Sequence, residues 1–407
     1  MYIYKVGVVG AGTMGAQIAE VVSYAGVPVL LADIQESLAR RGVESVRAIY
    51  QARVDKGKMT PEQLEEKMLL VTASPNLEAL HDVDLVIEAV SEEVTLKQRV
   101  FRELDRVCAR SAILASNTSA LSISAIGAST TRPGKVLGLH FFNPAYAMPL
   151  VEVIPGLATD PQTVDDVVGF AESLRKTPVI VKECAGFLVN RLLSPYLNEA
   201  VWCFQDGDVS IKEIDQDMVA FGMPVGPFML LDTVGLDIAF EVARILHRSY
   251  GPRMAPAPLL EALVKAGRWG IKSGRGFYEY SEGDERSGDQ ALDTLLQQVR
   301  QGGGQIRMEW TRLRPLLAMV NEAVTAYQEG VASARDIDLA MVAGTGFPNE
   351  KGGPLHVADQ LGIDHVLHEL EALRDTLGVR FWPAPMLRRM VDAGFTGQLA
   401  GRGFFAY

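Results

Sequence analysis

The fold is decided by the stretch Lys5-Val6-Gly7-Val8-Val9, which continues into Gly10-Ala11-Gly12-Thr13-Met14-Gly15 and then into Ala16-Gln17-Ile18-Ala19-Glu20. A short apolar strand, a G-x-G-x-x-G turn and a helix follow one another, which is the dinucleotide-binding fingerprint. Gly10 allows the tight turn, Gly12 lets the backbone approach a pyrophosphate, and Gly15 lets helix and strand pack closely. The helix N-terminus, at Thr13 and Met14, offers unpaired N–H groups and a partial positive charge to phosphates.

A second apolar strand, expected at residues 27–32, ends at Asp33. This acid lies about 20 residues after the glycines, where a carboxylate accepts the ribose hydroxyls of NAD. A 2′-phosphate would be repelled there, so NAD is favoured over NADP. The alternative is a glycine turn and a strand-end aspartate in some other α/β protein.

Composition narrows the classes of function. A chain of 407 residues is expected to hold two or three domains, and its net charge of -11 argues against a general nucleic-acid binder or a basic membrane-surface protein. Cys108, Cys184 and Cys203 form no disulfide framework or CxxC metal site, which favours a reducing compartment, here the cytoplasm. The first strand leaves no room for a signal peptide, and no apolar run is long enough to span a bilayer.

Strand and helix patterns alternate over residues 1–182, which predicts an α/β Rossmann-like domain with a mainly parallel, doubly wound sheet. One long polar helical stretch is expected at about 36–68. Further strands are expected at residues 84–90, 112–116, 135–142, 150–154 and 179–181.

From about residue 183 the pattern is helical and contains a repeat. Asn198-Glu199-Ala200 recurs as Asn321-Glu322-Ala323, and Gly274-Arg275-Gly276-Phe277 recurs as Gly401-Arg402-Gly403-Phe404. We therefore expect two tandem all-α domains, 183–282 and 306–407, joined by a polar, glycine-containing linker at 283–305.

His140 and Glu152 are the first candidates for chemistry. They lie in consecutive predicted strands joined by a turn, so they can face each other if the strands pair. A carboxylate on one imidazole nitrogen fixes the tautomer and stabilises the charged ring, and the other nitrogen can then take a proton from a substrate hydroxyl. A buried structural histidine with the glutamate elsewhere is an equally weighted alternative.

Two further polar residues are weaker candidates. Ser119 follows a strand at the sheet edge where such folds bind ligands, and Asn190 stands near the start of the first long helix of the helical region. From the residues alone, a cap or turn role suits Ser119 better than a substrate contact, and an ordinary polar position in a first helical turn suits Asn190 equally well. His365 and His368 have the spacing for a shared metal but lack further ligands, so no metal site is expected, and His81, His247 and His356 have no evident partner.

Together these residues resemble the 3-hydroxyacyl-CoA dehydrogenase family over nearly the whole chain. The resemblance is carried by residues 10–15, 88–93, 116–119, 140–144, 150–154, 187–191 and 274–277. The chain departs from the family's pattern at Ala185, where proline is usual, and at Pro149, where lysine is usual. The doubled helical region is similar to the dehydrogenase half of bacterial multifunctional fatty-acid oxidation proteins, without their hydratase domain.

The resemblance implies a role for each candidate residue. It implies that His140 is the catalytic base with Glu152 as its partner, and that Ser119 and Asn190 contact the substrate's 3-oxygen. It places Asp33, Glu92, Lys97 and Asn117 with the NAD ligands and Asn143 with the substrate ligands. Lys56, Lys58 and Arg53, on the polar helical stretch, are candidates for the phosphates of coenzyme A.

The second helical copy is expected to be structural, because Leu313 aligns with Asn190 and the copy has no nucleotide-binding domain of its own. Simple family members dimerise through a single helical domain, so the two copies are expected to form an intramolecular pseudo-dimer, in a monomer or a homodimer. Enoyl-CoA hydratase and thiolase are possible pathway partners.

The predicted reaction is the reversible, NAD-dependent oxidation of an L-3-hydroxyacyl-CoA to the 3-ketoacyl-CoA in fatty-acid β-oxidation. Two rivals stay open at this point: a dehydrogenase of a small free hydroxy acid, and a non-catalytic NAD-binding protein. The sequence sets neither the acyl chain length nor the pathway.

Overall fold

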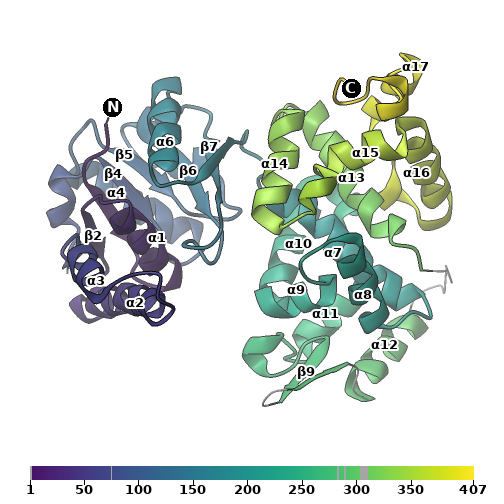
Figure 1. Cartoon of the computed structure of the whole chain (residues 1–407), viewed down its shortest axis with the longest axis horizontal. Coiled ribbons are helices and arrows are strands. Elements are labelled where there is room, and N and C mark those ends of the chain that lie inside the picture. The colour runs from purple at the N-terminus through teal and green to yellow at the C-terminus, as the bar shows by residue number, and fades with distance from the viewer. Residues whose placement is uncertain (1, 75, 282–283, 288–289, 303–309) are drawn as a thin grey trace. The chain divides into compact units, whose positions relative to one another are not determined.

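The computed structural model (Figure 1) describes residues 1–407 except 1, 75, 282–283, 288–289 and 303–309. Residues fall into two compact units, Met1–Phe187 and Leu188–Tyr407. No helix among the described residues is both long and apolar enough to cross a membrane.

The first unit is built on one eight-stranded sheet in the order β3-β2-β1-β4-β5-β6-β7-β8. All neighbouring strands are parallel except β6 and β7. The strands are β1 Val6–Val9, β2 Val29–Ala32, β3 Val71–Ser74, β4 Leu85–Glu88, β5 Ile113–Ser116, β6 Val136–Phe141, β7 Leu150–Pro155 and β8 Thr177–Ile180. Chain order reverses at β1, so the carboxyl ends of β1 and β4 form a switch point where such folds bind ligands.

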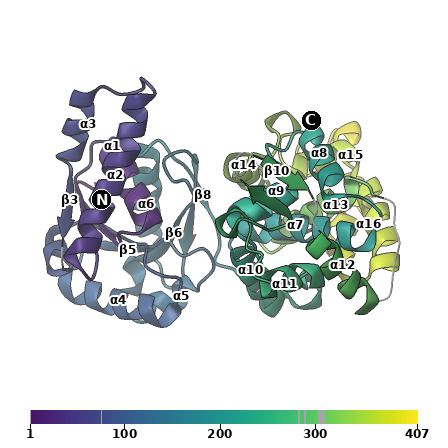
Figure 2. The same ribbon diagram turned by 90° about the horizontal axis from the view of Figure 1, so that it is seen from below.

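Helices cover both faces of this sheet, as Figure 2 shows for α1 and α6 against α4 and α5. The helices are α1 Thr13–Tyr24, α2 Glu36–Asp55, α3 Pro61–Met68, α4 Val94–Val107, α5 Ile123–Gly127 and α6 Pro161–Ser173. Helix α1 follows β1 directly, and its Ile18 and Val22 are buried in the core with Val8 of β1. The expected doubly wound α/β unit is therefore confirmed.

The single helical stretch expected at about 36–68 is wrong in detail, because the chain breaks between α2 and α3. Gly57 takes a positive φ of 66°, which ends the first helix in a conformation that glycine adopts at little cost. Thr60 then caps α3, forming a reciprocal capping box with Gln63, and Pro61 occupies the first turn. Strand β3 follows and was not expected.

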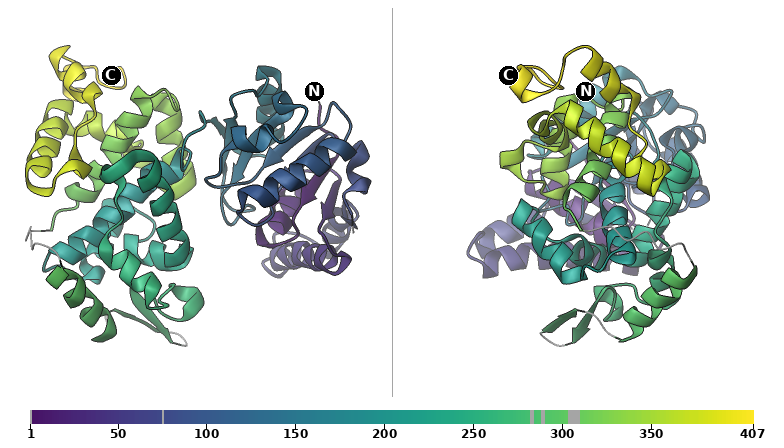
Figure 3. Two further views of the ribbon diagram at one scale, coloured as in Figure 1. Left: turned by 180° about the vertical axis from the view of Figure 1, so that it is seen from behind. Right: turned by 90° about the vertical axis from the view of Figure 1, so that its right-hand side faces the viewer.

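The second unit is mainly helical. Its helices are α7 Val189–Asp206, α8 Ile211–Phe221, α9 Pro227–Val234, α10 Leu236–Tyr250, α11 Pro258–Lys265, α12 Gln290–Gly302, α13 Leu313–Gln328, α14 Ala334–Thr345, α15 Pro354–Leu361, α16 Ile363–Leu377 and α17 Pro385–Asp392. Helices α7 and α13 pack along each other where the first half of the unit, α7–α12, meets the second half, α13–α17. In the left view of Figure 3 the yellow C-terminal helices lie at the top of this unit and the green helices of its first half at the bottom.

The two halves repeat the same local structure. Buried Asp215 accepts from the backbone N–H groups of Phe228 and Met229 at the start of α9. Buried Asp338 does the same for Leu355 and His356 at the start of α15. In each half one buried aspartate therefore satisfies the first turn of the third helix.

The range 283–305, expected to be a linker, contains ordered structure. Strands β9 (Tyr278–Ser281) and β10 (Asp284–Ser287) form an antiparallel ribbon, and α12 places Leu292 and Leu296 in the core of the first half. Residues 283, 288–289 and 303–305 of that range lie outside the described residues. The boundaries 1–182, 183–282, 283–305 and 306–407 remain a prediction about domains.

Candidate active site

A buried histidine–glutamate pair lies where β6 and β7 run antiparallel. The strands pair in a register that sets His140 directly opposite Glu152. His140 Nδ1 lies 2.7 Å from Glu152 Oε2, and the two side chains are 5% and 0% exposed. The short connection through residues 142–149 produces this register, as the spacing of the two residues predicts.

This contact orients the imidazole. With Nδ1 engaged by the carboxylate, Nε2 is the ring nitrogen left to exchange a proton with a ligand. The rings of Phe142 and Phe187, centred 4.5 Å and 5.9 Å from the imidazole, surround it with apolar surface. A carboxylate, an imidazole and a low-dielectric wall are the parts of a general base that becomes charged during reaction.

The fingerprint glycines are arranged to receive a dinucleotide. A Cβ on Gly15 would lie 1.7 Å from the carbonyl oxygen of Gly10, so only glycine allows α1 to approach β1 this closely. A Cβ on Gly12 would meet nothing within 4 Å, so the space in front of that backbone is open. Thr13 and Met14 form the first turn of α1 behind this opening. The arrangement fits the pyrophosphate of NAD.

Asp33 stands at the end of β2 and borders the same turn. Its Oδ2 accepts from the backbone N–H of Ala11 at 2.8 Å, and its Oδ1 accepts from that of Ile34 at 2.7 Å. These bonds fix the carboxylate while the remaining lone pairs stay able to accept from ribose hydroxyls.

A buried network centred on Glu88 links the ends of β4 and β5 with α4. Fully buried Glu88 accepts from Lys97 Nζ at 2.7 Å, from Ser116 Oγ at 2.7 Å and from the backbone of Val90. Lys97 also lies 3.3 Å from Glu92. Sequence reasoning gave Glu88 no role, because it stands at the end of an apolar run and its partners come from separate elements.

Glu92 connects this network to the serine expected at the substrate. Glu92 Oε1 accepts from the backbone N–H of Ser119 at 2.9 Å and from the hydroxyl of Thr118. Asn117 accepts from the backbone of Phe141, the residue after His140, at 2.8 Å. Hydrogen bonds thus tie residues 117–119 both to Glu92 and to the end of β6, next to His140.

Asn143 and Asn190 lie in different units. Asn143 accepts from Gln17 Nε2 of α1 at 3.1 Å, and the same glutamine accepts from the backbone of Ala145. Asn190 is the second residue of α7 in the second unit.

The basic candidates on α2 differ in their surroundings. Arg53 forms an ion pair at 2.7 Å with fully buried Glu20 and lies 4.4 Å from the ring centre of Tyr24. Burial raises the pKa of Glu20, and Arg53 opposes that rise. Lys56 and Lys58 lie just beyond the end of α2 and are exposed. Arg53 therefore has a structural partner that the sequence pattern did not predict.

Two histidines that were expected to lack partners have them. His356 Nδ1 lies 2.6 Å from Asp338, whose pKa burial raises to about 6. His81 Nδ1 lies 3.0 Å from the carbonyl oxygen of Glu78. Among the described residues, no group of three or more His, Cys, Asp or Glu side chains could hold a metal ion.

Both units match family models of known proteins. Residues 5–184 match the family model of the 3-hydroxyacyl-CoA dehydrogenase NAD-binding domain. The C-terminal domain model of the same family matches twice, at residues 186–280 and 313–407.

Individual relatives agree. A fatty acid oxidation complex subunit alpha from a Shewanella species is 37% identical over 393 residues, which cover 95% of this chain and 55% of that protein. The chain thus spans about half the length of the curated relatives it matches.

Solved structures also match. The crystal structure of 3-hydroxybutyryl-CoA dehydrogenase from Escherichia coli has a TM-score of 0.87 and 30% identity, covering 97% of this chain and 100% of that one. That of (S)-3-hydroxybutyryl-CoA dehydrogenase from Ralstonia eutropha has a TM-score of 0.67 and 38% identity, covering 69% and 99%. The chain belongs to the 3-hydroxyacyl-CoA dehydrogenase family of NAD-dependent oxidoreductases.

Proposed function

We propose that this protein catalyses the reversible oxidation of an L-3-hydroxyacyl-CoA to the 3-ketoacyl-CoA, with His140 as the general base paired to Glu152. The observation that carries the proposal is the buried 2.7 Å contact between His140 and Glu152, in the unit that also holds the NAD-binding turn. A protein that only bound NAD would have no use for an oriented, buried imidazole–carboxylate pair.

In the oxidative direction, His140 Nε2 takes the proton from the C3 hydroxyl while the C3–O single bond becomes the carbonyl double bond. NAD, when bound, accepts the hydride that leaves C3. Glu152 stabilises the imidazolium that forms, because its charge lies against Nδ1 in a buried site. Ser119 and Asn190 are the proposed donors to the 3-oxygen, and in the reverse direction His140 returns the proton.

Basic side chains are needed for the phosphates of coenzyme A, since the chain as a whole is acidic. Exposed Lys56 and Lys58 are the proposed contacts. Arg53 is a less favourable candidate than its charge suggests, because its guanidinium already pairs with Glu20.

The proposed NAD contacts are Gly10, Gly12, Thr13, Met14 and Gly15 at the pyrophosphate and Asp33 at the ribose. Glu92, Lys97 and Asn117 are further proposed NAD contacts. Asn143 is a proposed substrate contact. The family match supports the cofactor, and the geometry of the turn supports the first group.

Removing the carboxylate of Asp33 tests the cofactor assignment. Asp33→Ala removes the acceptor for the ribose hydroxyls, so the Kd for NADH should rise by about 10-fold or more, as expected for the loss of hydrogen bonds to a charged group. Because the chemical step is untouched, kcat at saturating NADH should stay close to that of the parent. Fluorescence titration with NADH and NADPH measures both affinities, and unchanged NADH affinity would remove Asp33 from the site.

The reaction itself is tested by the loss of NADH absorbance with acetoacetyl-CoA, a longer 3-ketoacyl-CoA and free acetoacetate. Turnover of the thioesters alone is expected, and their ratio begins to set the acyl chain length. Turnover of free acetoacetate alone would indicate a dehydrogenase of free acids. NADH binding without any turnover would indicate a non-catalytic protein.

We further propose that the second helical copy is structural and serves as an internal replacement for a partner subunit. The close packing of α7 on α13 supports this, and Leu313 takes the place that Asn190 has in the first copy. The cytoplasm is the proposed location and fatty-acid oxidation the proposed pathway, with hydratase and thiolase as possible partners.

This assembly predicts a monomer in solution. Sedimentation velocity at micromolar concentration should give one species near the mass of one chain, 44.3 kDa. A dimer that separates only when the protein unfolds would contradict the proposal.

A further inference from the structure

Two buried ion pairs join α7 and α13, and each repeats the other with the two helices exchanged. Arg191 Nε of α7 lies 2.7 Å from Glu322 Oε1 of α13. Arg314 Nε of α13 lies 2.6 Å from Glu199 Oε1 of α7. In the repeat, Arg191 corresponds to Arg314 and Glu199 to Glu322, so the contact is reciprocal, as in a twofold-symmetric interface.

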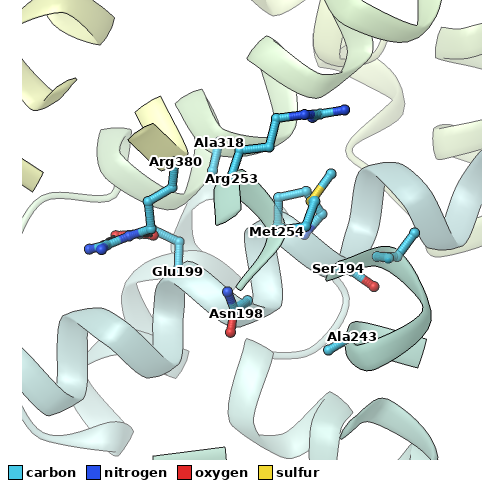
Figure 4. A pocket seen from close by; sticks show the side chains of 10 residues that line it. Ser194, Asn198, Glu199, Ala243, Arg253, Met254, Ala318 and Arg380 are labelled. Carbon is cyan, nitrogen blue, oxygen red and sulfur yellow. Dashed lines mark hydrogen bonds and ion pairs between the residues drawn. The ribbon is translucent and has the colours of Figure 1, made fainter. Parts of the chain in front are cut away.

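The surroundings of the two pairs correspond as well. Glu322 also pairs with Arg253, and Glu199 with Arg380. Glu329, at the end of α13, adds a second carboxylate to Arg191, and Asp206, at the end of α7, adds one to Arg314. Figure 4 shows one end of this network, with Arg380 beside Glu199 at a small pocket.

The two copies differ in the residue that precedes each arginine. The residue before Arg191 is Asn190, whereas the residue before Arg314 is Leu313. Both stand in the first turn of their helices. The arginine of the buried ion pair therefore follows a polar residue in the first copy and an apolar residue in the second.

Arg191 is a rigid neighbour for Asn190. Its side chain is fully buried, is held by carboxylates of Glu322 and Glu329, and lies 4.4 Å from the ring centre of Tyr250. The first turn of a helix has fewer bonds of its own than the middle, so side-chain contacts determine how firmly it is held. Both carboxylates come from the second copy.

We propose that Glu322 of the second helical copy is a positioning residue for the reaction: through Arg191 it holds the first turn of α7 and thereby aims Asn190 at the substrate oxygen. The inference rests on the proposed function, because it takes Asn190 as a contact to that oxygen. It gives the second copy a part in turnover as well as in assembly.

The rival explanation is that the ion pairs only hold the two halves together. In that case Glu322 and Glu199 should be equivalent, since their partners, burial and helices correspond. If Glu322 acts through Arg191 on Asn190, only Glu322 should affect turnover. The repeat thus supplies a control that is matched in chemistry and in position.

The experiment compares Glu322→Gln with Glu199→Gln. Both keep the shape of the side chain and remove one buried charge, so their thermal unfolding temperatures should fall by similar amounts. Glu322→Gln should lower kcat with acetoacetyl-CoA by about 10-fold or more, because misplacing a contact group by about 1 Å costs up to about 10²-fold. Glu199→Gln should stay within about twofold of the parent, and the Kd for NADH should change in neither.

Equal losses of kcat in the two variants, or no loss in either, would overturn the proposal. If Glu322→Gln fails to fold, the outer carboxylates provide a milder pair, Glu329→Gln against Asp206→Asn. The same one-sided loss of kcat is expected there, because Glu329 contacts Arg191 and Asp206 contacts Arg314.

A double variant separates this inference from the proposed function. Asn190→Ala should lower kcat, and adding Glu322→Gln should then cause little further loss, because both act through one contact. Full activity of Asn190→Ala would remove Asn190 from the mechanism and the inference with it. A multiplicative further loss in the double variant would leave Asn190 in place and overturn the role of Glu322 alone.

Discussion

His140→Ala is expected to lower kcat for the reduction of acetoacetyl-CoA by about 10²–10⁴-fold, the usual cost of removing a general acid–base group. The imidazole supplies the proton in this direction and takes it back in the other. Its removal leaves only solvent to do so, in a site walled by Phe142 and Phe187. Steady-state kinetics with NADH at saturation measures the loss.

The control for this variant is cofactor binding. Strands β4 and β5 separate β1 and β2, which carry the fingerprint turn and Asp33, from the β6–β7 pair, so the Kd for NADH should equal that of the parent. Turnover within a few-fold of the parent would exclude His140 as the base. Loss of NADH affinity together with turnover would instead indicate that the substitution disturbs the fold.

Glu152→Gln is expected to lower kcat by about 10²–10⁴-fold although His140 remains. The amide matches the carboxylate in shape but carries no charge, so it does not stabilise an imidazolium in a buried site. Glu152 is fully buried against His140, where water contributes little to screening. The measurement is kcat across pH, compared with that of the parent.

Coupling between the two residues gives the sharper test. If Glu152 acts through the imidazole, the double variant His140→Ala/Glu152→Gln should be no slower than His140→Ala alone. Losses that multiply in the double variant would show that Glu152 has a separate role. Parent-like kcat for Glu152→Gln alone would show that the carboxylate is structural.

Much of the first unit could be predicted because its signals are local. The turn from Gly10 to Gly15 is defined by a few adjacent residues, and its geometry requires glycine. The break after α2 was harder to predict, since Thr60 and Pro61 stand within a helical pattern of charged residues. Strand β3 is four residues long and half exposed, too short for a period to show.

The candidate site follows the same division. The facing of His140 and Glu152 depends on one short turn and was predictable, whereas the network of Glu88 depends on the packing of separate elements. The sequence indicates that Arg53 is a free cation on a polar helix, whereas the structure pairs it with Glu20. Long-range partners of this kind have no signature in spacing.

The reciprocal ion pairs between α7 and α13 have a consequence for how this protein can change. In a homodimer, one codon encodes both sides of the twofold axis, so every substitution at the interface occurs twice. Here Glu199 and Glu322 are encoded separately, and a substitution alters one side alone. The second copy can therefore differ from the first at single positions, as it does at Leu313, which corresponds to Asn190.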